Sequence, residues 1–259
     1  LTAMVRNLAT MTRVGLLTPG SEAAKRIAAT LGDADRLRKA RVHPVALLIA
    51  QRTYAAGRGI KGKGTWVPVP SVIDALDEAF YKAFVNVEPT GKRYLLGVDV
   101  SGSMSLTTGQ SSLTACEAAT AMAMVTMATE EAVTPMAFAD SFRPLPLSRR
   151  MRLEDALKHT RDQNFGRTDC ALPMLYASQK RMSVDVFVVY TDNETWAGNV
   201  HPSQALRAYR EQMGIAAKLI VVGITATGFT IADPNDAGML DVVGFDASVP
   251  EVMADFARN

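Results

Sequence analysis

Three short segments of the chain carry the kinds of oxygen-bearing side chains that bind divalent cations. They are Asp99-Val100-Ser101-Gly102-Ser103, Gly166-Arg167-Thr168-Asp169 and Thr191-Asp192-Asn193. Carboxylates and hydroxyls are hard oxygen ligands, which suit Mg²⁺ or Mn²⁺ with water completing an octahedron. The sequence has no His or Cys pair at the spacing of a zinc site, so zinc is disfavoured. The three segments together predict a magnesium or manganese site.

The first segment also has a purely structural interpretation. Asp and Ser are favoured in turns and at helix N-caps, so Asp99-x-Ser101-x-Ser103 alone would indicate a turn followed by a helix. The other two segments decide between the interpretations, because each follows a predicted strand or precedes a predicted helix. All three in this order favour a metal site.

Catalytic signatures are missing from the sequence. Ser101 does not lie in a G-x-S-x-G elbow, and the chain has no P-loop and no dinucleotide-binding fingerprint before a helix. The metal segments contain no His that could act as a general base. We therefore predict that the chain is not an enzyme, with metal-assisted phosphoryl chemistry as the alternative to be tested.

The elements that must position these residues fall into two parts of opposite charge. Residues 1–93 hold 15 Lys and Arg against 7 Asp and Glu, a net charge of +8, whereas residues 94–259 hold 13 against 19, a net charge of −6. The formal net charge of +2 is therefore an average over two different parts. Such an asymmetry favours polyanion contact by the basic part.

The basic part has the periodicity of short helices. We predict helices over residues 3–12, 21–32 with Ser21 as the N-cap, 36–40, 44–54 with Pro44 in the first turn, and 71–84 with Ser71 as the N-cap. Four glycines in residues 57–64 predict a loop. Short connections between helices are typical of a helical-repeat segment.

The acidic part alternates strands and helices. Predicted strands cover residues 94–100, 133–139, 184–190, 217–224 and 239–245, and predicted helices cover 112–129, 153–161, 171–181, 203–213 and 249–256. This alternation predicts an α/β fold with a doubly wound parallel sheet. Such sheets bind ligands at the carboxyl ends of their strands, where the metal segments lie.

The three-part metal pattern resembles the metal-ion-dependent adhesion site (MIDAS) of the von Willebrand factor A domain. The resemblance implies that the two serines and the threonine coordinate the metal, that the two aspartates bind it directly or through water, and that one position stays open for an acidic group. Carried over to this sequence, the metal residues are Asp99, Ser101, Ser103, Thr168 and Asp192.

Longer phrases narrow the resemblance to the Ro autoantigen family. They include Val87 to Arg93 (VEPTGKR), Thr168 to Met174 (TDCALPM), Thr191 to Thr195 (TDNET), and Gly228 to Pro234 (GFTIADP). On this resemblance, residues 91–259 form a von Willebrand factor A domain, Rossmann-like in fold, with the MIDAS. Residues 1–90 form the last helices of the helical-repeat (TROVE) ring.

Members of that family are cytoplasmic ribonucleoproteins of RNA quality control, which bind small noncoding Y RNAs and the single-stranded ends of misfolded RNAs. The resemblance therefore implies RNA as a partner. It also implies that this chain is part of a longer protein, as its start at Leu1 suggests. The two cysteines, too few for a disulfide framework, favour the same reducing, cytoplasmic setting. We expect no membrane partner, because no apolar run approaches 18 residues.

Basic residues in a run over residues 36–41 and at the predicted glycine loop are the candidates for phosphate contact. They are Arg36, Arg38, Lys39, Arg41, Arg58, Lys61 and Lys63. A solvated surface and a loop without a ligand is the alternative for this set. For the chain as a whole, the alternative function is a metal-dependent protein-interaction module that captures an acidic side chain of a protein ligand.

Overall fold

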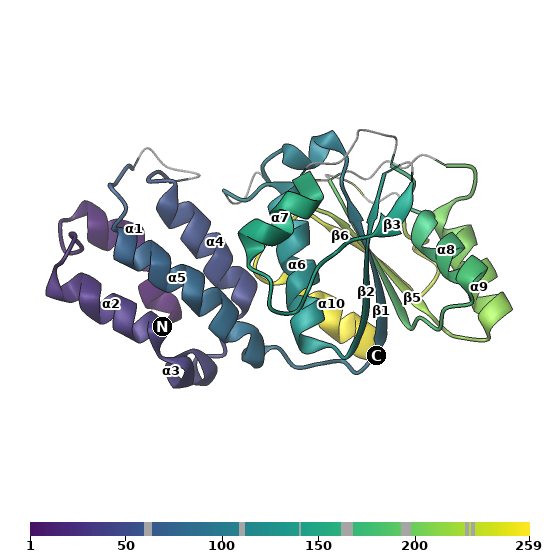
Figure 1. Ribbon diagram of the computed structural model, residues 1–259, viewed down its shortest axis with the longest axis horizontal. Helices are drawn as coiled ribbons and strands as arrows, with labels where there is room; N and C mark the ends of the chain where they lie inside the picture. The colour runs from purple at the N-terminus through teal and green to yellow at the C-terminus, as the bar shows by residue number, and fades with distance from the viewer. Residues whose placement is uncertain are drawn as a thin grey trace. The chain divides into compact units, whose positions relative to one another are not determined.

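The computed structural model describes residues 1–59, 64–108, 112–139, 141–161, 168–192, 198–225, 228 and 231–259. The described chain divides into two compact units, one built on Leu1–Glu88 and the other made of Pro89–Thr108 and Thr114–Asn259. Figure 1 shows that the first is helical and that the second is a sheet with helices on both faces.

The helical unit packs amphipathic helices around a leucine-rich core. Its helices are α1 (Thr2–Arg13), α2 (Glu22–Gly32), α3 (Ala34–Lys39), α4 (Pro44–Ala55) and α5 (Pro70–Lys82), followed by a short 3₁₀ helix, η1 (Ala83–Asn86). Leu8, Leu31, Leu37, Leu47 and Leu76 are fully buried. The apolar stripes read from the sequence therefore face this core.

Local capping chemistry sets where these helices begin. Ser21 caps α2 as expected, because its hydroxyl accepts a hydrogen bond from the Ala24 N–H. The predicted cap at Ser71 is wrong: α5 begins at Pro70 after Val69, without a side-chain cap. Proline fits the first turn since it lacks the N–H that would otherwise need a partner.

The second unit contains the elements that carry the metal segments. Its strands are β1 (Arg93–Asp99), β2 (Ala132–Phe138), β3 (Phe142–Pro144), β4 (Val186–Thr191), β5 (Lys218–Gly223) and β6 (Met239–Val243). Its helices are η2 (Gly102–Ser105), α6 (Ala115–Thr129), α7 (Leu153–Arg161), α8 (Leu172–Lys180), α9 (Pro202–Met213) and α10 (Val249–Arg258).

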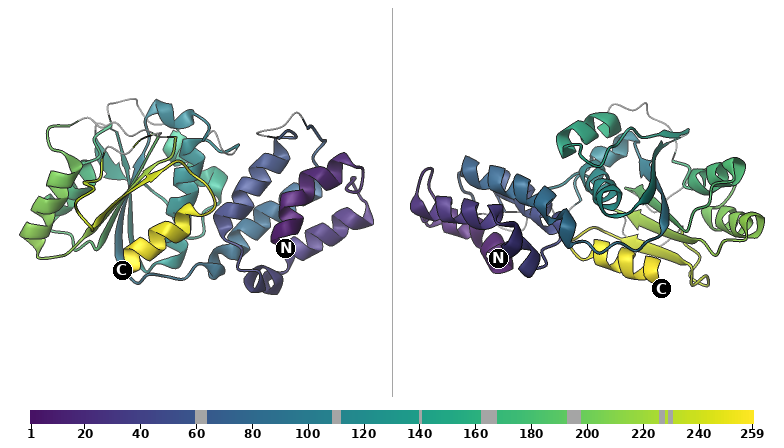
Figure 2. Two further views of the ribbon diagram at one scale, coloured as in Figure 1. Left: turned by 180° about the vertical axis from the view of Figure 1, so that it is seen from behind. Right: turned by 60° about the horizontal axis from the view of Figure 1, so that its bottom comes forward.

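The strand order is β3-β2-β1-β4-β5-β6. All neighbouring strands pair in parallel except β2 and β3, which pair in antiparallel orientation. Helices α6, α7 and α10 cover one face, and α8 and α9 cover the other (Figures 1 and 2). The α/β fold is therefore confirmed, while the wholly parallel sheet that we predicted ends in one antiparallel edge strand.

This topology explains why the metal segments meet. From β1 the chain moves to β2 on one side, and it later returns to β4 on the other side of β1. The carboxyl ends of β1 and β4 thus flank a switch point, where doubly wound sheets bind ligands. Asp99 ends β1 and Thr191 ends β4.

None of the helices in the described ranges is long and apolar enough to cross a membrane.

Candidate metal centre and its family

Asp99 lies at the base of the candidate site. Its side chain is fully buried, and its Oδ1 accepts a hydrogen bond of 2.8 Å from the Ser101 N–H. That bond folds the chain back directly after β1 and leads it into η2. The hydroxyl oxygens of Ser101 and Ser103 lie 3.1 Å apart, so both hydroxyls of the first segment are presented together.

Two threonines from other segments reach the second oxygen of the same carboxylate. Thr191 donates a hydrogen bond of 2.8 Å to Asp99 Oδ2, and Thr168 donates a longer one of 3.4 Å. The first contact joins β1 to β4, and the second joins β1 to the segment before α8. Three segments that are distant in sequence therefore converge on Asp99.

Asp192 completes the set from the end of β4. It is buried, and its main-chain carbonyl accepts hydrogen bonds from the N–H and the hydroxyl of Thr225, at 3.0 and 2.5 Å. Thr225 follows β5, so the neighbouring strand anchors the backbone of Asp192. The negative charge of the Asp192 side chain is close enough to raise the pKa of Asp99.

The electrostatics of this set fit a bound dication. Burial is the main cause that raises the pKa of Asp99 above its ordinary value, and hydrogen bonds from Ser101 and Thr191 oppose this rise. Two buried carboxylates next to each other repel, and a cation between them would offset both the repulsion and the burial cost. Ser103 is exposed and Thr168 is half-buried, so the set is open to solvent on one side.

The site differs from metal centres built on several acidic or sulfur ligands. In the part of the chain that the structure describes, no three His, Cys, Asp or Glu side chains gather where they could share a metal ion. The five residues here are two carboxylates and three hydroxyls, which is the hard oxygen set preferred by Mg²⁺.

The structure also shows residues that the sequence pattern did not single out. Thr191 belongs to a predicted segment, but the sequence assigns it no role. In the structure its hydroxyl makes the shortest side-chain hydrogen bond to Asp99. Thr225 lies in no motif, and nothing in the sequence marks it. Gly166, Arg167 and Asn193 of the predicted segments lie outside the described residues.

The predicted RNA-contacting residues lie on the surface of the helical unit where they are described. Arg36, Arg38 and Lys39 are exposed on α3, and Arg41 and Arg58 are exposed beyond α3 and α4. Lys61 and Lys63 lie outside the described residues. Tyr54 of the same unit is buried, and its ring stacks on Trp66 with centroids 6.3 Å apart.

Two family patterns match this chain. The Ro60 vWA domain matches residues 93–257, and the TROVE domain matches residues 1–53. The first match alone covers more than half of the chain and includes all five candidate metal residues. The chain belongs to the Ro60 family.

Ro60 relatives match this chain along its whole length. It is 52% identical over 262 residues to RNA-binding protein RO60 of Deinococcus radiodurans and 47% identical over 260 residues to RNA-binding protein RO60 of Caenorhabditis elegans. Each match covers 100% of this chain, but only 49% and 40% of the two relatives. The chain therefore spans about half the length, or less, of the Ro60 relatives it matches.

The crystal structure of the Deinococcus radiodurans Ro protein has the same fold, with a TM-score of 0.95 over 100% of this chain and 53% of that one. The predicted resemblance to the Ro family and its von Willebrand factor A fold is thus confirmed. These relatives are named as RNA-binding proteins.

Proposed function

We propose that the chain is part of an RNA-binding ribonucleoprotein that binds Y RNA and misfolded small RNAs in cytoplasmic RNA quality control. The observation that supports this most is the similarity over the whole chain to two RNA-binding proteins of the Ro60 family. The net charge of +8 in residues 1–93 supports it independently, because cationic surface binds phosphates and releases counterions.

The RNA contacts are proposed to come from Arg36, Arg38, Lys39, Arg41 and Arg58, with Lys61 and Lys63. Two of the α3 cations pair with neighbouring carboxylates: Arg36 with Asp33 at 3.2 Å and Arg38 with Asp35 at 3.7 Å. All four side chains are well exposed, and exposed pairs contribute about 0–1 kcal/mol. Both arginines can therefore exchange their partners for phosphates at little cost.

Filter binding of a single-stranded RNA at low salt tests this proposal. Changing Arg36, Arg38, Lys39 and Arg41 to Gln is expected to weaken binding and to lower the salt slope by about 0.7 for each lost phosphate contact. The matched control changes four exposed cations of the other unit, Arg143, Arg150, Lys180 and Arg181, to Gln, and should leave both values unchanged. Equal losses of RNA affinity in the two variants would contradict the assignment of these residues to RNA contacts.

We further propose that Asp99, Ser101, Ser103, Thr168 and Asp192 hold one Mg²⁺ or Mn²⁺ as a MIDAS. The supporting observation is the convergence of three segments on the buried Asp99 carboxylate. When bound, the dication supplies a positive charge that attracts an anionic group of a ligand. The hydroxyls of Ser101 and Ser103 would help to hold it, while Thr191 and Thr225 hold the two aspartates in place.

Asp99→Ala with metal titration by calorimetry tests the site. We expect the heat of Mg²⁺ binding to disappear, because the carboxylate on which the other segments converge is gone. Metal binding that is unchanged in Asp99→Ala would show that the three segments do not form one site.

A specific observation also favours a second function. In this function the chain is a protein-interaction module whose metal site captures an acidic side chain of a protein ligand. Residues 94–259 carry a net charge of −6, which repels polyanions such as RNA but tolerates a single carboxylate at a dication. Chelation separates the two functions. Capture of a protein ligand should vanish in EDTA, whereas RNA binding through the basic helical residues should persist.

A further inference from the structure

A cavity of about 410 Å³ lies beside the candidate metal site, within the von Willebrand factor A unit. One wall is the loop after β1 together with η2, including Ser101, Met104 and Ser105. The opposite wall is the start of α6 and the end of α7, including Cys116 and Arg161. Because Ser101 belongs to both, the cavity and the metal site are adjacent.

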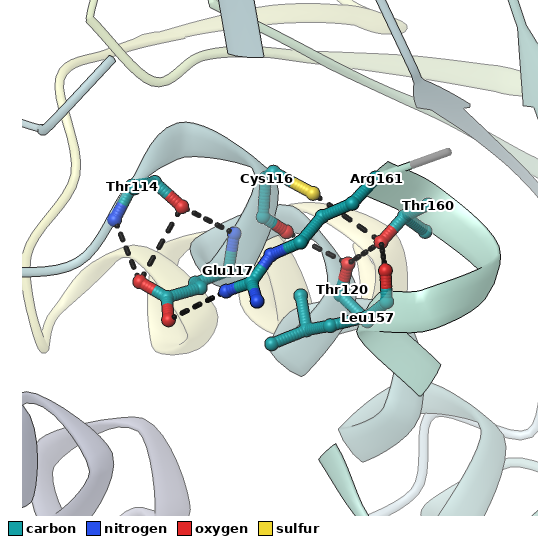
Figure 3. Close-up of polar contacts among 7 residues, drawn as sticks. All are labelled: Thr114, Cys116, Glu117, Thr120, Leu157, Thr160 and Arg161. Carbon is teal, nitrogen blue, oxygen red and sulfur yellow. Dashed lines mark hydrogen bonds and ion pairs between the residues drawn. The ribbon is translucent and has the colours of Figure 1, made fainter. Parts of the chain in front are cut away.

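The polar groups inside this cavity already have partners. The Cys116 thiol donates to the Thr160 hydroxyl at 3.2 Å, and this hydroxyl lies 3.1 Å from that of Thr120 and 3.2 Å from the Leu157 carbonyl (Figure 3). Met104 and Cys116 are buried with 1% and 4% of their surface exposed. The interior therefore presents satisfied polar atoms and apolar surface, which suits an apolar side chain.

Among the described residues that line the cavity, Arg161 is the one cation. Arg161 is half-exposed and donates from Nη2 to Glu117 Oε1 at 3.1 Å, while the other Glu117 oxygen accepts from the Thr114 N–H at the start of α6 (Figure 3). A guanidinium has five N–H donors, and this ion pair uses one of them. Arg161 and a dication at the metal site would together place positive charge beside this cavity.

These features favour a peptide over RNA as the occupant. None of the described residues that line the cavity is aromatic, so these residues offer a nucleobase no stacking platform. The net charge of −6 in residues 94–259 opposes a polyanion. A peptide with one acidic residue meets the metal and Arg161 with little repulsion.

We propose that this cavity selects the protein ligand of the metal site: it takes the apolar side chain next to the Asp or Glu that binds the metal. This inference rests on the proposed metal site and on its function as a receptor for an acidic side chain. The partner is then a protein segment in which an acidic and a large apolar residue are adjacent.

Two labelled peptides test the selection by fluorescence anisotropy in Mg²⁺. One is acetyl-Gly-Asp-Leu-Gly-amide, and the other has Gly in place of Leu. We expect the Leu peptide to bind about tenfold more tightly or better, because the cavity removes a leucine side chain from water. Both peptides should lose binding in EDTA.

Ser105→Phe fills the cavity from its exposed rim. We expect this change to lower the affinity of the Leu peptide to that of the Gly peptide. Ser148→Phe, at an exposed serine away from the cavity, should keep the full difference. Arg161→Gln should weaken both peptides severalfold, because the cation at the mouth is lost; unchanged affinity would contradict the role given to Arg161. Calorimetry with Mg²⁺ verifies that each variant is folded and binds metal.

The outcomes separate this inference from the functions proposed above. Metal-dependent binding of both peptides with equal affinity would overturn the cavity proposal and leave the metal site standing. An absence of metal binding in the unchanged protein would overturn both. A short oligouridine that binds in Mg²⁺ and loses affinity in Ser105→Phe, but not in Ser148→Phe, would assign the cavity to RNA and overturn the peptide proposal.

Discussion

At the scale of single residues, three donors hold the Asp99 carboxylate. The main-chain N–H of Ser101 and the hydroxyls of Thr168 and Thr191 each donate a hydrogen bond to it, and Asp192 acts on it through charge. The five candidate ligands could be named from the sequence because each of their three segments is a short motif that resembles part of the MIDAS. Thr191 and Thr225 could not be assigned roles, because a lone threonine after a strand has many possible partners.

Asp192→Asn is expected to remove metal binding without unfolding the protein. The change removes one ligand charge, but it also relieves the repulsion between two buried carboxylates. Thermal unfolding in EDTA should show an unchanged or higher midpoint, and calorimetry should show no heat from Mg²⁺. Asp155→Asn, an exposed carboxylate on α7, is the control that should bind metal normally. A large loss of stability in Asp192→Asn would contradict this account.

His43 makes the helical unit sensitive to acid. Its Nδ1 accepts a hydrogen bond of 3.2 Å from the Val45 N–H as the N-cap of α4, and burial lowers its pKa to about 4. As the pH falls, the unfolded chain takes up a proton on His43 near pH 6.5, whereas the folded chain takes it up only at lower pH. The contribution of neutral His43 to the free energy of unfolding is therefore complete above pH 6.5. It is lost as the pH falls towards 4, by up to about 3 kcal/mol.

His43→Asn tests this linkage, because Asn keeps a capping oxygen and does not titrate. Urea unfolding at pH 7 and pH 4.5 should show a smaller loss of unfolding free energy in the variant than in the unchanged protein. Equal losses in the two proteins would exclude His43 as a source of the acid sensitivity.

At the scale of elements, strand order brings the distant metal segments together. Strands that are buried on both faces read as apolar runs, so β1, β4 and β5 could be predicted closely. The edge strand β3 was missed, because three residues ending in Pro144 show no such run. The start of α5 was misassigned since Ser71 and Pro70 both suit a first turn, and only the backbone decides between them.

Gly97 allows α8 to approach β1 closely behind the metal site. A Cβ at Gly97 would lie 2.9 Å from Pro173 Cγ and 3.4 Å from a ring carbon of Phe138. Gly97→Ala should therefore destabilise the protein by about 1–3 kcal/mol, the usual cost of overpacking. Urea unfolding measures this loss. Gly228→Ala is the matched control and should differ little, because no atom of the described residues lies within 4 Å of the added Cβ. A Gly97→Ala protein of full stability would contradict the close approach.

At the scale of the whole molecule, two activities are proposed for two parts of opposite charge. Residues 1–93, with a net charge of +8, are assigned to RNA, and residues 94–259, with a net charge of −6, are assigned to the metal and a protein ligand. This division was visible in the sequence once the charges were counted by part. Which basic side chains meet RNA was not, because exposed cations look alike with and without a ligand.

One measurement tests this division most directly: filter binding of a single-stranded RNA to the intact chain across a range of salt, in Mg²⁺ and in EDTA. The account predicts measurable affinity at low salt, a steep loss as salt rises, and the same curve with and without the metal. No RNA affinity at low salt, or affinity that disappears in EDTA, would contradict it.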